Sequence, residues 1–83
     1  MMDGLRVVVA PVTGRVRLLP PKAFARGREL LGAGQAVAVI DGGGDKTTVT
    51  SPVPGLLDGM LVHEGEPVHA GQALLVVRTE EVA

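Results

Sequence analysis

The sequence predicts an all-β domain, because its apolar residues fall in short β-branched runs separated by turn-forming residues. Twelve Gly and six Pro are spread through 83 residues, which favours strands joined by tight turns over long helices. Phe24 is the only aromatic residue, so the predicted core is aliphatic. A chain of this length has a thin core. We expect one domain over residues 1–83, with its core over about 5–78.

The composition argues against several classes of protein. The chain has no cysteine, which excludes disulfides and thiolate metal sites. A net charge of −1 and a single aromatic residue give no footprint for nucleic acid. No apolar run approaches the roughly 18 residues of a membrane span, and Met1-Met2-Asp3 does not begin a signal peptide. The expected location is therefore the cytoplasm, with no membrane partner.

The first half predicts two clear strands and one irregular segment. Residues 5–10 are a β-branched run that ends at Pro11, and residues 15–19 alternate polar and apolar side chains until Pro20-Pro21. Residues 22–34 are predicted as a protruding loop with a short strand around 29–31, because glycines disfavour a long helix there. Phe24 is expected to fold back as a lid on the core.

The second half predicts a central hairpin followed by two more strands. Residues 35–40 are apolar on both faces, and residues 46–51 are their predicted partner, with Lys46, Thr48 and Thr50 on one face. A strand over 56–62 is expected to contain a bulge near Asp58-Gly59. Val68 is expected in a short paired strand and 73–78 in the last strand, with the tail fraying from Thr79.

Two copies of one pattern flank the central hairpin. Residues 10–16 match residues 51–57, and residues 31–39 match residues 68–76. The first copy is four residues longer, and these extra residues fall within the irregular segment 20–34. Two copies are too few for a solenoid. The duplication instead predicts two half-sheets packed about a pseudo-twofold axis.

This arrangement resembles the biotinyl/lipoyl carrier domain family. Its marks are Pro-x-x-Gly and then Gly-x-x-Val-x-x-Gly-Gln before an apolar strand, and the second copy is complete at 64–72. The resemblance implies a hammerhead fold, which is a flattened β-barrel or sandwich of two four-stranded antiparallel sheets. In that family the scaffold presents one hairpin, whose lysine is covalently modified and swings between active sites.

Within the family, the chain is most similar to the biotin carboxyl carrier protein of acetyl-CoA carboxylase, a component of fatty acid biosynthesis. That protein has a Pro-rich insertion, the thumb, after the first Pro-x-x-Gly. Here Pro20-Pro21-Lys22-Ala23-Phe24 resembles it and implies a short thumb-like loop at about 20–28.

The pattern breaks at the position of the modified lysine. The family reads Glu-Ala-Met-Lys-Met after the central apolar strand, and Gly44 stands where the lysine would be. The five matching positions, which form the candidate hairpin tip, are Asp41, Gly42, Gly43, Gly44 and Asp45. Without an amine there is no amide to biotin or lipoate, so we expect no cofactor at this position. Attachment to Lys46, roughly 6–7 Å further along the strand, remains the alternative.

The glycines also suit a tight turn that presents no side chain. A two-residue type I′ turn needs positive φ at both central residues, and Gly-Gly supplies it. A bare tip also lets the backbone of a partner approach closely. We therefore expect a docking role for the hairpin and no catalytic activity in the chain itself.

The sequence gives little support for phosphate binding, metal binding or nucleophilic catalysis. Residues 42–47 suggest a phosphate-binding loop, but the Walker pattern needs Gly before Lys and a following helix, and Asp45 and β-branched residues stand there instead. A group of polar residues on a predicted turn is not expected to bind metal: His63, Glu64, Glu66 and His69. Three hydroxyl residues have no base at a suitable spacing for nucleophilic catalysis: Thr13, Thr47 and Ser51.

Two functions follow as hypotheses. The first is an unmodified carrier homologue that serves as an accessory or docking module for the subunits of an acyl-CoA carboxylase. The second is a lipoyl-like interaction module without a carrier role. Adaptor subunits of export pumps use such halves, but a long helical hairpin interrupts their central turn, and no such insertion occurs in this sequence.

Overall fold

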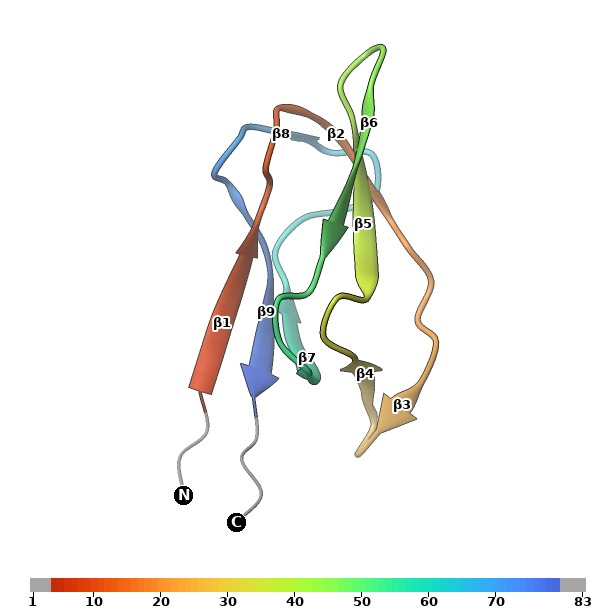
Figure 1. The fold of residues 1–83 in the computed structure, drawn as a ribbon, viewed down its shortest axis with the longest axis vertical. Coiled ribbons are helices and arrows are strands. Elements are labelled where there is room, and N and C mark those ends of the chain that lie inside the picture. Colours follow the sequence, from red (N-terminus) through yellow and green to blue (C-terminus); the bar gives the residue numbers. More distant parts are fainter. Residues whose placement is uncertain (1–3, 80–83) are drawn as a thin grey trace.

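A computed structural model describes residues 4–79, which form nine strands and no helix (Figure 1). The strands are β1 (Gly4–Val9), β2 (Gly14–Leu18), β3 (Phe24–Ala25), β4 (Arg28–Leu31), β5 (Ala36–Asp41), β6 (Lys46–Thr50), β7 (Gly55–Met60), β8 (Pro67–Val68) and β9 (Ala73–Thr79). The predicted all-β class is confirmed. The predicted short strands at 29–31 and Val68 are also present.

The strands form two antiparallel sheets, of five and four strands. The orders are β1-β9-β7-β4-β3 and β6-β5-β2-β8. The prediction of two four-stranded sheets is wrong by one strand, because the two-residue β3 extends the larger sheet. The sheets do not close into a barrel, since β1 and β3 end one sheet while β6 and β8 end the other.

The core lies between the inner faces of the sheets and is aliphatic, as predicted. β5 contributes buried residues to both faces, whereas β6 alternates between an exposed face and a face that carries buried Val49. The core cluster contains Val8, Ala10, Val16, Leu31, Val37, Ala38, Ile40, Val49, Val62, Val68, Leu74, Leu75 and Val77. This burial supplies the main stabilisation of a small domain without disulfides.

The duplicated sequence pattern has reciprocal contacts in the structure. Ala10 N donates to Gln72 O at 2.9 Å, which joins the first copy to the second. Ser51 N donates to Gln35 O at the same distance, which joins the second copy to the first. The sheet order β1-β9-β7-β4 likewise repeats β6-β5-β2-β8 strand for strand. Such exchange between the copies is what a pseudo-twofold axis requires.

Two glycines of the repeat allow equivalent close approaches of the backbone. A Cβ atom on Gly14 would lie 2.4 Å from Asp41 O. A Cβ atom on Gly55 would lie 2.3 Å from Arg78 O. Real Cβ atoms do not come this close to a backbone oxygen, so each Pro-x-x-Gly motif requires its glycine for close packing.

The segment after Pro20-Pro21 forms a hairpin, whereas a loop was predicted. Phe24 pairs with Glu29, and Ala25 pairs with Arg28. The turn between them has positive φ at Arg26 (54°) and Gly27 (76°). A non-glycine residue in this conformation costs about 1–2 kcal/mol. The lid role predicted for Phe24 is wrong, because its side chain is 67% exposed.

The other predicted boundaries need small corrections. The bulge in β7 is confirmed by a register shift between Leu57 and Gly59, but the strand ends at Met60 and not at residue 62. Thr79 belongs to β9 and pairs with Gly4, so fraying does not begin there. The rest of the predicted frayed tail lies outside the described residues.

Glu29 is a partly buried carboxyl group on β4, beside the core. Glu29 lines a small enclosed space together with Leu31 and Val37. Burial raises the pKa of Glu29 above its usual value of 4.5. The folded state therefore holds this proton more tightly than the unfolded state does.

Because the folded pKa is the higher one, this contribution to stability is complete below about pH 4.5 and is lost as the pH rises through the folded pKa. We expect Glu29→Gln to gain stability relative to the parent protein as the pH increases from 4 to 7. Urea unfolding across this range measures the difference. Parallel pH profiles for the two proteins would contradict the prediction.

Candidate functional site

The central hairpin β5–β6 projects beyond the other strands at one end of the molecule (Figure 1). The first residue of β1 and the last residue of β9 lie at the opposite end. Asp41 and Lys46 form the last pair of the hairpin ladder, and Gly42 N donates to Asp45 O at 2.9 Å. The residues predicted for the site thus all lie on one protruding element.

The hairpin turn differs from the predicted type I′ geometry. Among the three glycines only Gly43 has positive φ, at 98°, whereas type I′ needs two such residues in succession. The Asp41 carboxylate fixes the turn, since its Oδ1 accepts a hydrogen bond of 3.0 Å from Gly43 N. The hydrogen bond from the Asp41 side chain therefore determines the conformation of this turn, because three successive glycines alone permit several conformations.

Replacing Asp41 by alanine is expected to lower the free energy of unfolding by about 1 kcal/mol, because Gly43 N loses its acceptor. The hairpin amides should exchange with solvent faster than in the parent protein. Asp45→Ala is the matched control, since the Asp45 side chain is exposed at the tip. Equal destabilisation by the two variants, measured by chemical unfolding, would count against the turn assignment.

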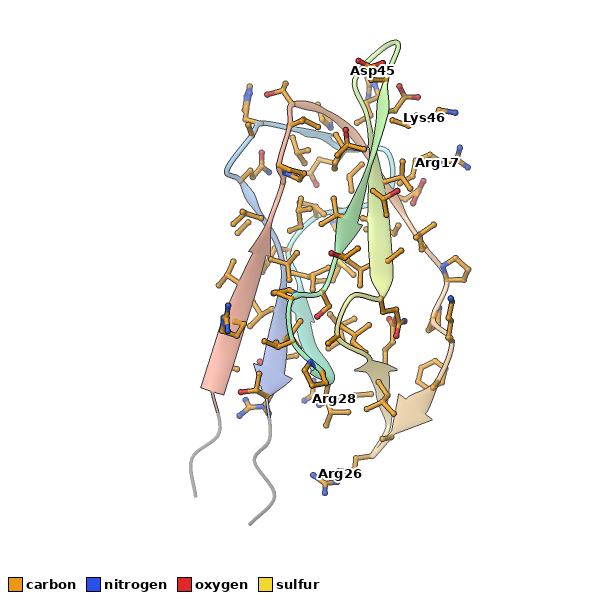
Figure 2. All side chains as sticks on the ribbon, viewed as in Figure 1. Arg17, Arg26, Arg28, Asp45 and Lys46 are labelled. Carbon is orange, nitrogen blue, oxygen red and sulfur yellow. The ribbon has the colours of Figure 1, made fainter. Side chains whose placement is uncertain are left out.

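Gly44 has room for a side chain. A Cβ atom built on it meets nothing within 4 Å, and its φ lies outside the positive range. The amine in this hairpin belongs to Lys46, which is exposed on β6 opposite Asp41 (Figure 2). The open position at the tip, Gly44, and the amine of the hairpin, on Lys46, therefore belong to different residues.

A shallow hollow of about 470 Å³ lies beside the tip of the hairpin. It is lined by Thr13, Gly14, Arg15, Asp41, Gly43, Pro67, Val68 and His69. Two of these side chains hold the surrounding turns: Thr13 Oγ1 accepts from Ala70 N at 3.0 Å, and Arg15 Nη1 donates to Gly65 O at 3.0 Å. The hollow therefore has fixed walls beside the tip.

Sequence reasoning missed the cations that flank the hairpin. In the register of the four-stranded sheet, Arg15 lies opposite Asp41, and Arg17 lies opposite Val39. Arg17 and Lys46 line one hollow, and Figure 2 shows both side chains on the same side of the hairpin. The alternation of polar and apolar residues over 15–19 already indicated that Arg15 and Arg17 share the outward face of their strand.

Several residues considered for phosphate binding, metal binding or nucleophilic catalysis have structural roles. Residues 46–50 form a strand, so the phosphate-loop motif lacks its helix. Glu64 Oε1 accepts from Leu18 N at 2.7 Å, and Glu66 Oε1 accepts from His63 N at 2.9 Å. Ser51 Oγ donates to Val53 O at 2.6 Å. Over residues 4–79, no group of three or more acidic or histidine side chains is placed to hold a metal ion.

No known family model matches the chain, and no curated protein matches it. Within the described residues there is no helix with the length and apolar character needed to cross a membrane. The candidate site is therefore defined by its geometry alone.

Proposed function

We propose that this protein is an unmodified homologue of the biotinyl/lipoyl carrier domains, with the hammerhead fold, and that it works in the cytoplasm as a docking module of an acyl-CoA carboxylase-type complex. The observation that carries the proposal is the protruding hairpin of a duplicated scaffold with a glycine at its tip. The reciprocal contacts of Ala10 and Ser51 support the duplication. The resemblance to the family in sequence supports the choice of complex.

The chemistry of the tip supports docking over group transfer. A biotinyl or lipoyl amide needs an amine at the tip, and Gly44 has none. Gly44 instead leaves open space, the tip carries two carboxylates, Asp41 and Asp45, and the amine of Lys46 follows directly. A partner can therefore approach the backbone of the tip while it contacts these charged groups.

Binding to purified biotin carboxylase and carboxyltransferase subunits tests the proposal. We expect one of them to bind the parent protein, and Lys46→Glu or Asp45→Lys to weaken that binding at least tenfold, about 1.4 kcal/mol. Arg6→Glu is the control, because Arg6 is exposed on β1, a strand that lies away from the projecting end of the β5–β6 hairpin (Figure 1). Absence of binding to both subunits, or equal loss in the control, would refute it.

A further inference from the structure

The only aromatic residue of the protein lies on its surface. The Phe24 side chain is 67% exposed, although a domain of this size has few large apolar groups with which to build a core. Aromatic side chains bury more apolar area than any others and are enriched at the centres of protein interfaces. An exposed Phe24 therefore marks the β3–β4 hairpin as a candidate contact surface.

The β3–β4 hairpin is held in a defined shape. Leu30 N donates to Ala23 O at 2.8 Å, which extends the pairing of the two strands. Arg28 Nη1 donates to Asp58 O at 3.3 Å and to Leu57 O at 3.4 Å, which ties β4 to the bulge of β7. Phe24 is thus presented on a preorganised element, and less ordering entropy is lost on binding.

The hairpin carries a surplus of positive charge. Residues 20–31 include three exposed cations, Lys22, Arg26 and Arg28, and one half-buried carboxylate, Glu29, which pairs with Phe24 across the hairpin. Asp58 lies 3.9 Å from Arg28, but the same carboxylate also accepts a hydrogen bond of 3.1 Å from Arg78. Figure 2 shows Arg26 and Arg28 at the end of the molecule opposite Asp45 and Lys46. This charge selects for an acidic partner.

The hairpin also has an open sheet edge. β3 ends the five-stranded sheet, so its outer edge has no strand beside it among residues 4–79. An extended segment can pair with such an edge through its backbone while its side chains contact the strand. Edge, aromatic side chain and cations all lie on one element.

We infer that the β3–β4 hairpin is a second docking surface, and that its partner is an extended, acidic segment of another protein. The segment adds along the outer edge of β3, one of its apolar side chains covers Phe24, and its carboxylates are attracted to the net positive charge of the hairpin. This surface is separate from the β5–β6 hairpin, so the protein would connect two partners.

The probe is a short synthetic peptide with the repeating pattern Glu-Thr-Leu-Thr, which places Glu and Leu on the same face of an extended strand, and the neutral control has Gln in place of each Glu. Amide chemical shifts of the ¹⁵N-labelled protein measure binding. We expect shifts centred on residues 22–30 with the acidic peptide, and binding at least tenfold weaker with the neutral one. Phe24→Ala and the double variant Lys22→Glu/Arg26→Glu should each lose at least tenfold in affinity. Arg6→Glu, on β1 and outside both hairpins, should bind as the parent does.

Three results would overturn the inference: no shifts with the acidic peptide, shifts centred away from β3, or equal binding by the Phe24→Ala variant. Binding to phosphatidylserine vesicles in place of the peptide would assign the surface to a membrane. Self-association that Phe24→Ala abolishes would assign it to a second copy of the chain. Thermal unfolding checks the variants, and the Phe24→Ala midpoint should match that of the parent because the side chain is exposed.

Discussion

Gly14→Ala is expected to lower the free energy of unfolding by about 3 kcal/mol. The added Cβ would lie 2.4 Å from Asp41 O and 2.8 Å from Asp41 C, and backbone atoms cannot yield as the end of a flexible side chain can. The strain falls where β2 meets the end of β5, directly below the hairpin tip. Chemical unfolding of the variant measures this cost.

Gly55→Ala is the matched variant in the second copy, and we expect a similar loss because its Cβ would lie 2.3 Å from Arg78 O. Gly59→Ala is the control, since a Cβ there meets nothing within 4 Å. The two variants should differ in where they act. Gly14→Ala should perturb the amides of the hairpin, and Gly55→Ala those at the opposite end. Loss below about 1 kcal/mol for both would contradict the close packing of the two motifs.

Gly44→Lys is expected to make the hairpin a substrate for biotin ligase or lipoate ligase. The position has open space and a φ outside the left-handed range, so the new amine should extend from the tip. Intact mass after co-expression with each ligase measures the modification. Gly59→Lys supplies an open position away from the tip as the control. No modification of Gly44→Lys would count against a carrier scaffold.

Most of the strands were predictable because each contains several consecutive residues with an alternating or β-branched pattern. β3 was not, since residues 22–27 lack any such pattern and the strand is two residues long. Its pairing depends on a turn with positive φ at Arg26, a conformation that an arginine disfavours on its own. The β3–β4 hairpin is stabilised by hydrogen bonds from the Arg28 side chain to the bulge of β7.

The predicted hairpin tip lies at an exposed end of the molecule, but its turn type did not follow from the sequence. Three successive glycines permit several turns, and the choice depends on the hydrogen bond between Asp41 Oδ1 and Gly43 N. Phe24 was predicted to fold back as a lid on the core because aromatic side chains bury large apolar areas. Its exposure follows from a hairpin that the sequence pattern did not reveal.

We propose that the β5–β6 hairpin carries no biotinyl or lipoyl group. The intact mass of the parent protein after co-expression with biotin and lipoate ligases, followed by peptide mapping, tests this directly. We predict the mass of the unmodified chain. A biotinyl or lipoyl group mapped to Lys46 would contradict the claim and would make the protein a carrier with a displaced attachment site.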